Sequence, residues 1–546
     1  MRSLPDLART LDLSVDDLLP YGHRMAKLSH PLVKRLGNAP PRGSLILVTA
    51  LTPTKHGEGK TTVSIGLAQG LAKAGRRAML ALREPSMGPV FGVKGGGTGG
   101  GRATVDPSTD INLHFTGDLH AITAANNLLA AMVDNALHFN LKGAPDVRRV
   151  TWRRVLDVND RSLRNVVLGL GGTMDGLPRQ GAFDITAASE IMALLCLSTG
   201  IADLKARLAR LVVGFGGPET KEAPVTAADL GAVGPMAATL RDALLPNLVQ
   251  SQEGVPALLH GGPFANIAHG CNSVIATRSA LALSDYVVTE AGFATELGME
   301  KFFDLKCRAS GLWPRAVVVV VTARALRHHG GDTELSATGK DVRAALQRGM
   351  VNVDRHVANV RAFGFDPVLA INVFGRDTEE ELACIETLCA ERGYTVGRCD
   401  GFVQGGDGAV ALAEKVAAAA ARPQPPRKFL YEPEAPIRAK IEAVATKMYG
   451  ARDVSFSDAA TRAAARFEAL KLPVCIAKTP LSFSDQPAAG GNPEPFTLQV
   501  RDLSLRAGAG FLLAVTGETQ TMPGLPRVPN ANGIDLTEDG EIVGVH

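Results

Sequence analysis

The stretch LILVTALTPTKHGEGKTTVSIGLAQGL, residues 45–71, changes character twice along its length. It begins with an apolar run that is typical of a buried strand, and it ends with an amphipathic segment that predicts a helix. Between them lies GEGKTT (57–62), a glycine-rich turn that leads directly into the helix. A helix N-terminus offers unpaired backbone N–H groups and a partial positive charge, so this order of elements predicts a phosphate site.

The turn is close to the phosphate-binding loop G-x-x-x-x-G-K-[ST]. Thr54 stands where that loop has its first glycine, and the sequence continues with Lys55, His56, Gly57, Glu58, Gly59, Lys60 and Thr61. We predict that these residues bind ATP, with Lys60 at the β- and γ-phosphates and the Thr61 hydroxyl near the accompanying Mg²⁺. The alternative is an ordinary strand-to-helix turn with a solvated lysine.

Length, charge and cysteine content limit the classes of protein to consider. A chain of 546 residues is too long for one hydrophobic core and predicts roughly two to four domains. Its 58 basic and 55 acidic residues predict neither a nucleic-acid nor a membrane partner. We expect no membrane span and no secretory signal, because the apolar runs are too short. Seven scattered cysteines without a CxxC pair predict reduced thiols in a cytoplasmic protein.

Short apolar runs alternate with amphipathic segments along much of the chain. The expected strands are 45–50, 78–82, 165–171, 211–215, 256–261, 285–291, 316–323 and 368–374. They are rich in Val, Ile and Leu without clean alternation, which is typical of parallel strands buried on both faces. We therefore predict an α/β protein with a large, doubly wound, mostly parallel sheet of the P-loop type and two smaller α/β domains.

Two changes in composition suggest the domain borders. At AAAAARPQPPRKF (417–429) an alanine-rich helix meets prolines that cannot continue it. A weaker change, from an apolar strand to a polar loop, falls near 325–340. We predict a nucleotide domain over 1–330, a second α/β domain over 331–430 and a third over 431–546.

Arg83 and Glu84 directly follow the strand expected at 78–82. Ligands of open α/β sheets bind at the carboxyl ends of the strands. A guanidinium is a planar fork that suits a phosphate or a carboxylate. We therefore expect Arg83 in the same site as Lys60, with a surface salt bridge as the alternative.

The next segment, GVKGGGTGGGRATV (92–105), has seven glycines in its first ten residues. Such a composition argues against a helix or a strand, and it leaves a disordered tether or a backbone cradle for an anion. Lys94 favours the cradle. Further on, His114, Asp118 and His120 are candidates for acid–base or metal groups, although a lone histidine is more often structural.

Several of these segments together resemble the formate–tetrahydrofolate ligase family. TPTKHGEGKTT (52–62) is similar to its ATP loop, and LREPSMGPVFGVKGGGTGGG (82–101) is similar to its glycine-rich signature. Further resemblances lie at 115–135, 260–273, 320–331 and 521–536. The match spans essentially the whole chain and suggests the single-function bacterial type. Departures from the usual family residues are Lys55, His56, Gly97, Thr98 and Arg102.

The resemblance implies an enzyme of one-carbon metabolism that joins formate to tetrahydrofolate, with Mg·ATP as the third substrate. It implies the products 10-formyltetrahydrofolate, ADP and phosphate, with formyl phosphate as the intermediate. By resemblance, Lys60 and Arg83 are catalytic, and Glu84 and Lys94 belong to the formyl phosphate loop. Phe374 and Phe402 resemble the two aromatics that sandwich the pterin, the second being commonly tryptophan. A homotetramer and a monovalent cation, K⁺ or NH₄⁺, are also implied.

Two other interpretations stay open. A regulatory P-loop ATPase of the partitioning or metal-insertion kind would also suit GEGKTT, and Lys55 resembles the second lysine of such loops. The stretch REPSMGPVFGVKGGG (83–97) argues against it. An inactive paralogue acting as a binding scaffold is the third possibility, and the presence of Lys60 and Arg83 argues against that one.

Overall fold

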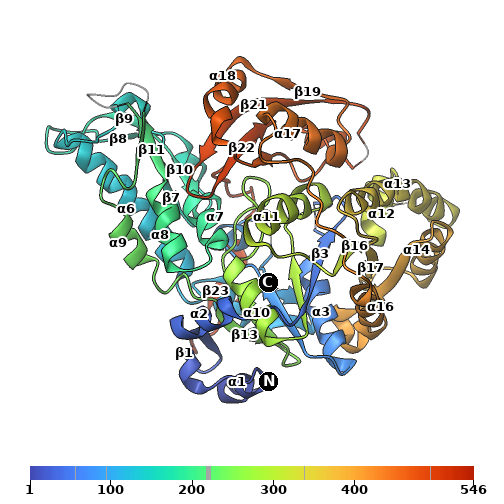
Figure 1. Ribbon diagram of the computed structural model, residues 1–546. Helices are drawn as coiled ribbons and strands as arrows, with labels where there is room; N and C mark the ends of the chain where they lie inside the picture. Colours follow the sequence, from blue (N-terminus) through green and yellow to red (C-terminus); the bar gives the residue numbers. More distant parts are fainter. Residues whose placement is uncertain (56, 94, 217–222, 337, 492, 546) are drawn as a thin grey trace.

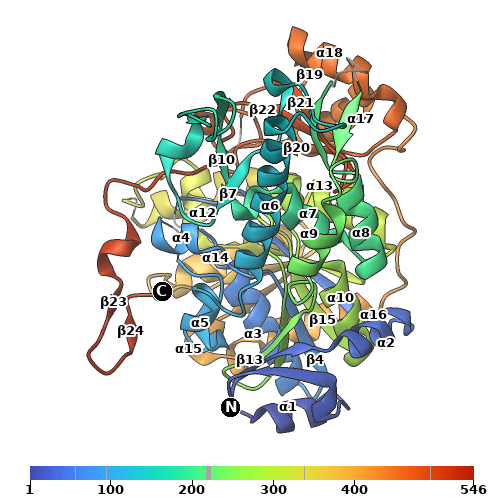
Figure 2. The same cartoon turned by 90° about the vertical axis from the view of Figure 1, so that its left-hand side faces the viewer.

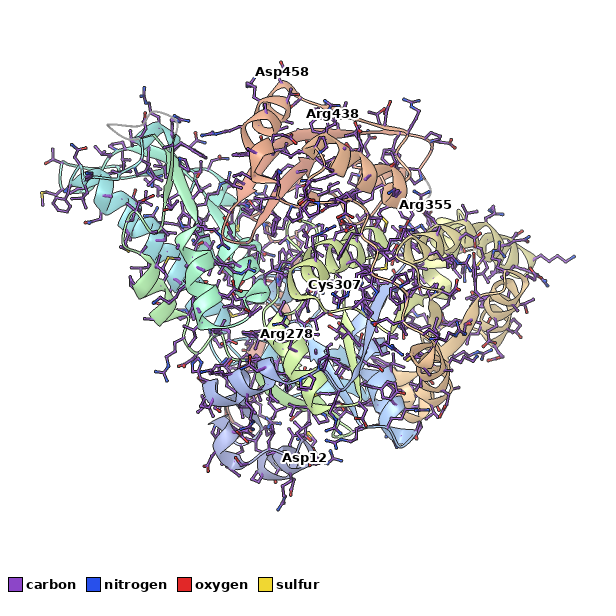
Figure 3. All side chains as sticks on the ribbon, in the orientation of Figure 1. Asp12, Arg278, Cys307, Arg355, Arg438 and Asp458 are labelled. Carbon is purple, nitrogen blue, oxygen red and sulfur yellow. The ribbon has the colours of Figure 1, made fainter. Side chains whose placement is uncertain are left out.

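The computed structural model describes residues 1–546 except His56, Lys94, 217–222, Ala337, Asn492 and His546. A large sheet with helices on both faces forms the centre of the molecule (Figure 1). A mainly helical lobe stands at one side of it, and a smaller sheet lies above the large sheet, beside the upper part of the lobe. All side chains are drawn on the same view in Figure 3, where Cys307 lies at the centre and Asp12 at the lower end.

The middle of the large sheet is parallel. Its strand order is β14 (Pro256–Leu259), β4 (Ala78–Leu82), β15 (Tyr286–Glu290), β3 (Ser44–Ala50), β16 (Ala316–Val321), β17 (Val368–Asn372) and β18 (Thr395–Cys399). Beyond β14 the sheet continues with antiparallel strands, namely β13 (Asn247–Ser251), β2 (Met25–Leu28) and β1 (Leu18–Tyr21). The predicted α/β class with a large, mostly parallel sheet is confirmed.

Alternate residues of the parallel strands enter two separate hydrophobic cores. On β3, Leu45 and Leu47 belong to one core, while Ile46 and Val48 belong to the other. The first core also takes side chains from α10 (Val274–Leu283), α12 (Ala323–His329) and α13 (Lys340–Ala362). The second takes side chains from α3 (Lys60–Lys73) and α16 (Val410–Ala421). Because both faces are covered, the strands carry apolar runs without polar alternation.

The lobe and the smaller sheet share a third core. The lobe contains α6 (Asp118–His138), α7 (Glu190–Leu197), α8 (Ile201–Ala209) and α9 (Val233–Thr239). The smaller sheet has the order β19 (Asp453–Phe456), β21 (Thr497–Arg506), β22 (Phe511–Thr516) and β20 (Val474–Ala477), with α17 (Ile437–Val444) and α18 (Asp458–Phe467) packed on it. Cys475 and Leu513 of this sheet pack into the lobe's core of leucines. Although α6 and α13 are long, no helix in the described part of the chain is both long and apolar enough to cross a bilayer.

Two of the strands expected in the parallel sheet lie outside it. The segments 165–171 and 211–215 were expected as buried parallel strands. Instead, β8 (Val166–Leu168) pairs antiparallel with β9 (Arg179–Gly181), and β11 (Val212–Phe215) pairs antiparallel with β12 (Pro224–Thr226). The prediction was wrong because an apolar run does not specify its partner, and Val167 is in fact 63% exposed.

The glycine-rich stretch also contains a strand that its composition argued against. Gly99–Gly100 forms β5, which pairs antiparallel with β6 (Ala103–Asp106). β6 in turn pairs with β13 and so attaches this hairpin to the edge of the large sheet. The expectation failed because neighbouring strands supply the hydrogen bonds that an isolated glycine segment lacks.

The three predicted domains stay a prediction. β17 and β18 lie within the segment 331–430, yet they continue the large sheet by pairing with β16 and with each other. The strands of the segment 431–546 pair among themselves instead. Sharing one sheet does not decide whether 331–430 folds independently.

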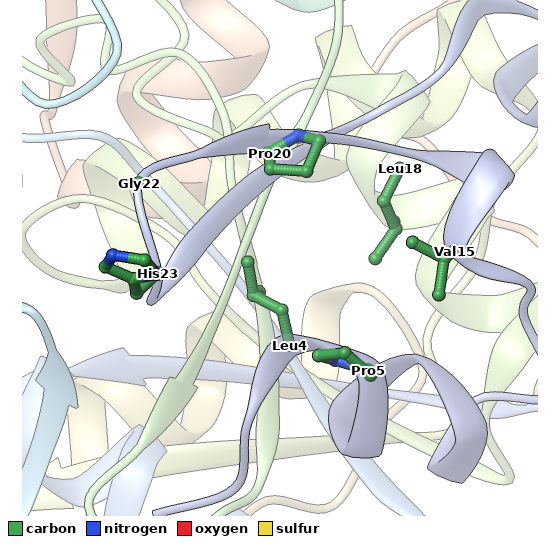
Figure 4. Close-up of a pocket in the computed structure, with 7 residues that line it drawn as sticks. All are labelled: Leu4, Pro5, Val15, Leu18, Pro20, Gly22 and His23. Atoms are coloured by element: carbon green, nitrogen blue, oxygen red, sulfur yellow. The ribbon is translucent and has the colours of Figure 1, made fainter.

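The N-terminal segment encloses a small hollow (Figure 4). Its volume is about 210 Å³, and it lies between α1 (Leu4–Thr10) and the β1–β2 hairpin. It is lined by Leu4, Pro5, Val15, Leu18, Pro20, Gly22 and His23. Apart from His23 the lining is apolar, so this hollow lacks the charge that a phosphate site needs.

Candidate active site

The carboxyl ends of β4, β15 and β3 lie next to one another, and predicted site residues meet there. Lys60 begins α3 after the loop that follows β3, and Arg83 directly follows β4. Glu290 is the last residue of β15, which lies between those two strands. Its Oε2 accepts a hydrogen bond from the Thr61 hydroxyl at 2.9 Å, and its Oε1 lies 3.4 Å from Nη2 of Arg83. One carboxylate therefore joins the two predicted halves of the site.

The charge of Lys60 is balanced by this carboxylate. The Lys60 side chain is desolvated, which lowers its pKa, whereas the negative charge of Glu290 opposes that shift. The nearby positive charge of Arg83 lowers the pKa of Lys60 further. A desolvated cation gains most from an anionic ligand, because water no longer competes for it. The strand ends thus form a site suited to a phosphate.

The loop between β3 and α3 is held from within by Glu58. The backbone N–H of Thr54 donates to Oε1 of Glu58 at 2.7 Å, and the hydroxyl of Thr322 donates to Oε2 at 2.6 Å. Nδ2 of Asn372 donates to the Glu58 carbonyl at 3.0 Å. Gly59 has φ of +71°, and a Cβ there would collide with Asn372. Glycine at this position is therefore required both by the backbone conformation and by the neighbour.

Other predicted residues of the loop contribute less to the geometry. Gly57 also has a positive φ of +73°, and the side chain of Lys55 is exposed. His56 and Lys94 lie outside the described residues, so their predicted roles stay predictions.

Two histidines fasten the start of the same loop. His356 of α13 accepts the Thr52 N–H on Nε2 at 2.8 Å, and its Nδ1 lies 2.6 Å from the Thr295 hydroxyl. Since Nε2 accepts, the ring is neutral with its proton on Nδ1, and burial lowers its pKa well below the ordinary value. Nε2 of His329, on α12, donates to the Thr52 carbonyl at 2.8 Å. Both bonds fix the direction in which the chain leaves β3.

Glu84 is buried beside an ion pair. Nζ of Lys27 lies 2.7 Å from Oδ1 of Asp118, and Nδ2 of Asn247 donates to Oδ2 of Asp118 at 2.8 Å. Oε2 of Glu84 has no hydrogen-bond partner among the described residues. Burial, with the charge of Asp118 as the second cause, raises the pKa of Glu84 well above its ordinary value. The nearby cation, Lys27, partly opposes this shift but is already paired with Asp118.

The segment after Glu84 is anchored to the lobe by Asp157. The Ser86 hydroxyl donates to Oδ1 of Asp157 at 2.6 Å, and the Met87 N–H donates to Oδ2 at 3.0 Å. These bonds support the first turn of α4 (Met87–Phe91). Burial raises the pKa of Asp157 to about 6. The lobe thus sets the position of the chain that leaves β4.

The two aromatic candidates follow the neighbouring strands β17 and β18. Phe374 is half-buried, the Arg324 guanidinium lies 5.0 Å from its ring centroid, and its ring lies close to Gly59. Phe402, in α15 (Gly401–Gln404), is 54% exposed and packs against Gly100 and Gly101 of the β5–β6 hairpin. The structure therefore brings Phe374 to the loop between β3 and α3, and Phe402 to the glycine-rich segment.

The remaining candidates do not join this centre as catalytic groups. His114 and His120 are exposed, and Asp118 is occupied by Lys27 and Asn247. Within the part of the chain that the structure describes, no group of three or more His, Cys, Asp or Glu side chains is arranged to hold a metal ion.

Sequence reasoning missed Glu290, Arg324 and the histidines that hold Thr52. A signal for Glu290 existed, because the run DYVVTEA (285–291) ends in a carboxylate at the edge where Arg83 was expected. His356 had no such signal. It lies far along the chain in the middle of a helix, and only packing brings it to the loop.

The whole chain, residues 1–546, matches the family model described as Formate--tetrahydrofolate ligase. Curated proteins named Formate--tetrahydrofolate ligase from Myxococcus xanthus, Paracoccus denitrificans and Symbiobacterium thermophilum are each 52% identical to it. The alignments cover 100%, 99% and 100% of this chain, and 99%, 97% and 98% of those relatives.

Proposed function

This chain belongs to the formate–tetrahydrofolate ligase family, and we propose that Lys60, Thr61, Arg83 and Glu290 form its active centre. The enzyme ligates formate to tetrahydrofolate and consumes ATP in doing so. The observation that carries the assignment is the meeting of Thr61 and Arg83 on one carboxylate at adjacent strand ends, with Lys60 beside them. Such strand ends are where open α/β sheets bind ligands.

We propose that the reaction runs through formyl phosphate. Formate is a poor electrophile because its carbonyl carbon carries an anionic oxygen. That oxygen attacks the γ-phosphorus of ATP, the bond to the β–γ bridging oxygen breaks, and ADP leaves. N10 of tetrahydrofolate then attacks the carbonyl carbon of the mixed anhydride. Inorganic phosphate leaves with the former formate oxygen, and N10 loses its proton.

Phosphoryl transfer depends on positioning and on neutralising charge. Lys60 and the backbone N–H groups at the start of α3 would offset the charge of the transferred phosphoryl group. The fork of Arg83 would hold formyl phosphate, and Glu290 keeps that guanidinium oriented. The Thr61 hydroxyl donates a hydrogen bond to Glu290, so its oxygen lone pairs stay free for the Mg²⁺ that ATP brings.

Phe374 and Phe402 are proposed to hold the pterin. A flat heterocycle gains most from aromatic faces. The exposed ring of Phe402 supports this role, as does the position of Phe374 next to Gly59 of the ATP loop. A pterin held there would lie near the phosphate site, as transfer to N10 requires.

A monovalent cation, K⁺ or NH₄⁺, is also part of the proposal. The unpartnered Oε2 of Glu84 supports it, because the nearby cation, Lys27, is already paired with Asp118. Glu84 is the residue that would hold the cation, because Asp118 is already occupied by Lys27 and Asn247. When bound, it would supply the positive charge that allows Glu84 to ionise beside Arg83.

We propose a homotetramer in the cytoplasm. Exposed apolar side chains on and next to the β8–β9 hairpin, among them Leu170 and Met174, support an assembly. The C-terminal hairpin of β23 (Asp535–Leu536) and β24 (Ile542–Val543) projects from the body in Figure 2 and exposes Leu536. The thiols of all seven cysteines are free, which suits a reducing compartment. Light scattering on the purified chain would measure the assembly.

Formate labelled with ¹⁸O tests the intermediate. If formyl phosphate forms, one labelled oxygen per turnover appears in inorganic phosphate, measured by mass spectrometry. Unlabelled phosphate would rule the intermediate out. Product formation must also require formate, ATP and tetrahydrofolate together. ATP hydrolysis in the absence of formate and folate would instead favour a regulatory ATPase.

A further inference from the structure

A large cleft lies between the lobe and the smaller sheet, which stand side by side at the top of Figure 1. Its volume is about 860 Å³, within the range of small-molecule sites. None of Lys60, Thr61, Arg83 and Glu290 lines it. Arginines line it from both sides, namely Arg148, Arg153, Arg179, Arg462, Arg466 and Arg506. The cleft is therefore distinct from the site at the strand ends.

Acidic groups offset only part of this positive charge. Asp184, Glu190 and Asp502 are the carboxylates in the lining. Arg153 pairs with Asp184, with 3.0 Å between Nη1 and Oδ1. Oε1 of Glu190 accepts the backbone N–H of Gly508 at 2.7 Å, and burial raises the pKa of this glutamate. Two acids outside the lining also take part, because Asp146 pairs with Arg148 and Asp134 pairs with Arg179. The six arginines still exceed the three carboxylates of the lining, although the whole chain has a net charge of only +3.

Two arginines have no partner of their own. The side chains of Arg462 on α18 and Arg506 on β21 form no hydrogen bond or ion pair within 4.0 Å with the residues that the structure describes, although the charge of Arg506 acts on Glu190 and lowers its pKa. Figure 3 labels Asp458, the first residue of α18, at the top of the molecule. Both guanidinium groups are therefore available to an anion that enters the cleft.

Two other arginines are held in place. Arg466 stacks on Phe215, with 3.8 Å between the guanidinium carbon and the ring centroid. The side chain of Arg179 is 8% exposed and pairs with Asp134 at 2.6 Å, yet its buried Nε has no hydrogen-bond partner. Stacking and burial restrict these planar forks, so less side-chain entropy is lost when they bind a ligand. A buried donor without a partner gains a further hydrogen bond from such a ligand.

We propose that this cleft binds a small oligo-anion, a molecule with two or more carboxylate or phosphate groups. A single phosphate would reach only one wall, whereas the arginines are distributed over β9, α18, β21 and the segment before β7 (Arg154–Leu156). Guanidinium groups bind both kinds of anion in a bidentate manner. Two sources fit this chemistry: a free oligophosphate, or the γ-glutamyl tail of a folate polyglutamate. The second source rests on the proposed function.

Calorimetric titration of the full chain tests the proposal with two probes, tripolyphosphate and penta-γ-glutamate. The test variant is Arg462→Gln with Arg466→Gln. The control is Arg438→Gln with Arg501→Gln, which removes the same charge from the same part of the chain but outside the cleft. We expect at least one probe to bind the unmodified chain, and the test variant to bind it about tenfold more weakly per arginine removed. The control should bind nearly as well as the unmodified chain.

The two probes and a kinetic comparison separate the sources. If penta-γ-glutamate binds and the test variant raises KM for a tetrahydrofolate polyglutamate but not for the monoglutamate, the ligand is the folate tail. If only tripolyphosphate binds, the ligand is a free oligophosphate. If neither probe binds, or if test and control variants weaken binding equally, the proposal is overturned. Binding is measured without turnover, so a failure of the proposed ligase reaction would be seen separately.

Discussion

At the strand ends Nη2 of Arg83 lies 3.4 Å from a carboxylate oxygen, whereas in the cleft between the lobe and the smaller sheet Arg462 has no such partner among the described residues. The strand-end centre offsets the charges of Lys60 and Arg83 with Glu290, which also accepts the Thr61 hydroxyl, and Glu58 contributes further negative charge near Lys60. The cleft leaves its cations in excess. A partly buried cation needs an internal counter-charge, since desolvation is costly, while an exposed cation in a cleft is stabilised by water until a ligand arrives. The first arrangement positions groups for chemistry, and the second selects a ligand by charge.

Among the substitutions that test this difference between the two sites, removing the Arg83 side chain should have the largest effect. We expect Arg83→Ala to lower the rate of product formation by about 10³-fold or more, because charge stabilisation at the transferred group is lost. ATP affinity should stay nearly unchanged. Steady-state rates with all three substrates and an equilibrium titration of ATP measure both effects.

Arg77→Ala is a suitable control for that experiment. Arg77 is 41% exposed and pairs with Asp12, away from the site. An equal collapse of ATP affinity in Arg83→Ala would assign Arg83 to the nucleotide instead of to formyl phosphate.

Neutralising Glu290 tests whether internal balance matters at the strand ends. Glu290→Gln keeps a group that can accept from Thr61 but removes the charge that faces Arg83 and Lys60. We expect kcat to fall by about 10²-fold, a loss comparable with that of one preorganised polar group. A thermal unfolding scan would check that the variant is folded. An unchanged kcat in the folded variant would contradict the role given to Glu290.

Shortening Phe402 should have a smaller effect, confined to the folate. Phe402→Ala is expected to raise KM for tetrahydrofolate by about tenfold, the upper range of one aromatic contact. Because the side chain is 54% exposed, the melting temperature should hardly change. Phe402→Trp enlarges the stacking face, so KM for tetrahydrofolate should stay at the value of the unmodified chain or fall below it. If KM stays constant in both variants, the pterin binds elsewhere.

Replacing Asp157 should leave catalysis unchanged and alter only how stability depends on pH, with a shift of a few degrees in melting temperature. Its pKa is raised to about 6 from 3.8. Between these values the folded chain holds a proton that the unfolded chain has lost, so stability falls as pH rises through this window. The contribution is about 2 to 3 kcal/mol across the window. Asp157→Asn should flatten the fall in melting temperature between pH 4 and pH 6.5 by a few degrees. An equally steep fall in the variant would show that other groups cause it.

Local patterns in the chain were enough to predict the α/β class and the loop between β3 and α3. Apolar runs, glycine positions and the helix that follows depend on neighbours a few residues away, so they can be read from a single stretch. Because ligands bind at strand ends, the sequence also predicted that Arg83 lies near Lys60, although the strand order was not known. In the structure, Arg83 and the start of α3 do meet, because Arg83 and Thr61 both contact Glu290. The catalytic roles of Lys60 and Arg83 are proposals.

Pairing and packing between distant segments could be decided only by the tertiary structure. The runs at 165–171 and 211–215 were predicted as central strands, yet the strands within them pair antiparallel with neighbours outside the large sheet. His356 reaches Thr52 across 304 positions of the chain. The cleft collects arginines from Arg148 to Arg506. No local pattern signals such meetings, because long-range packing and charge complementarity determine them only once the chain is folded.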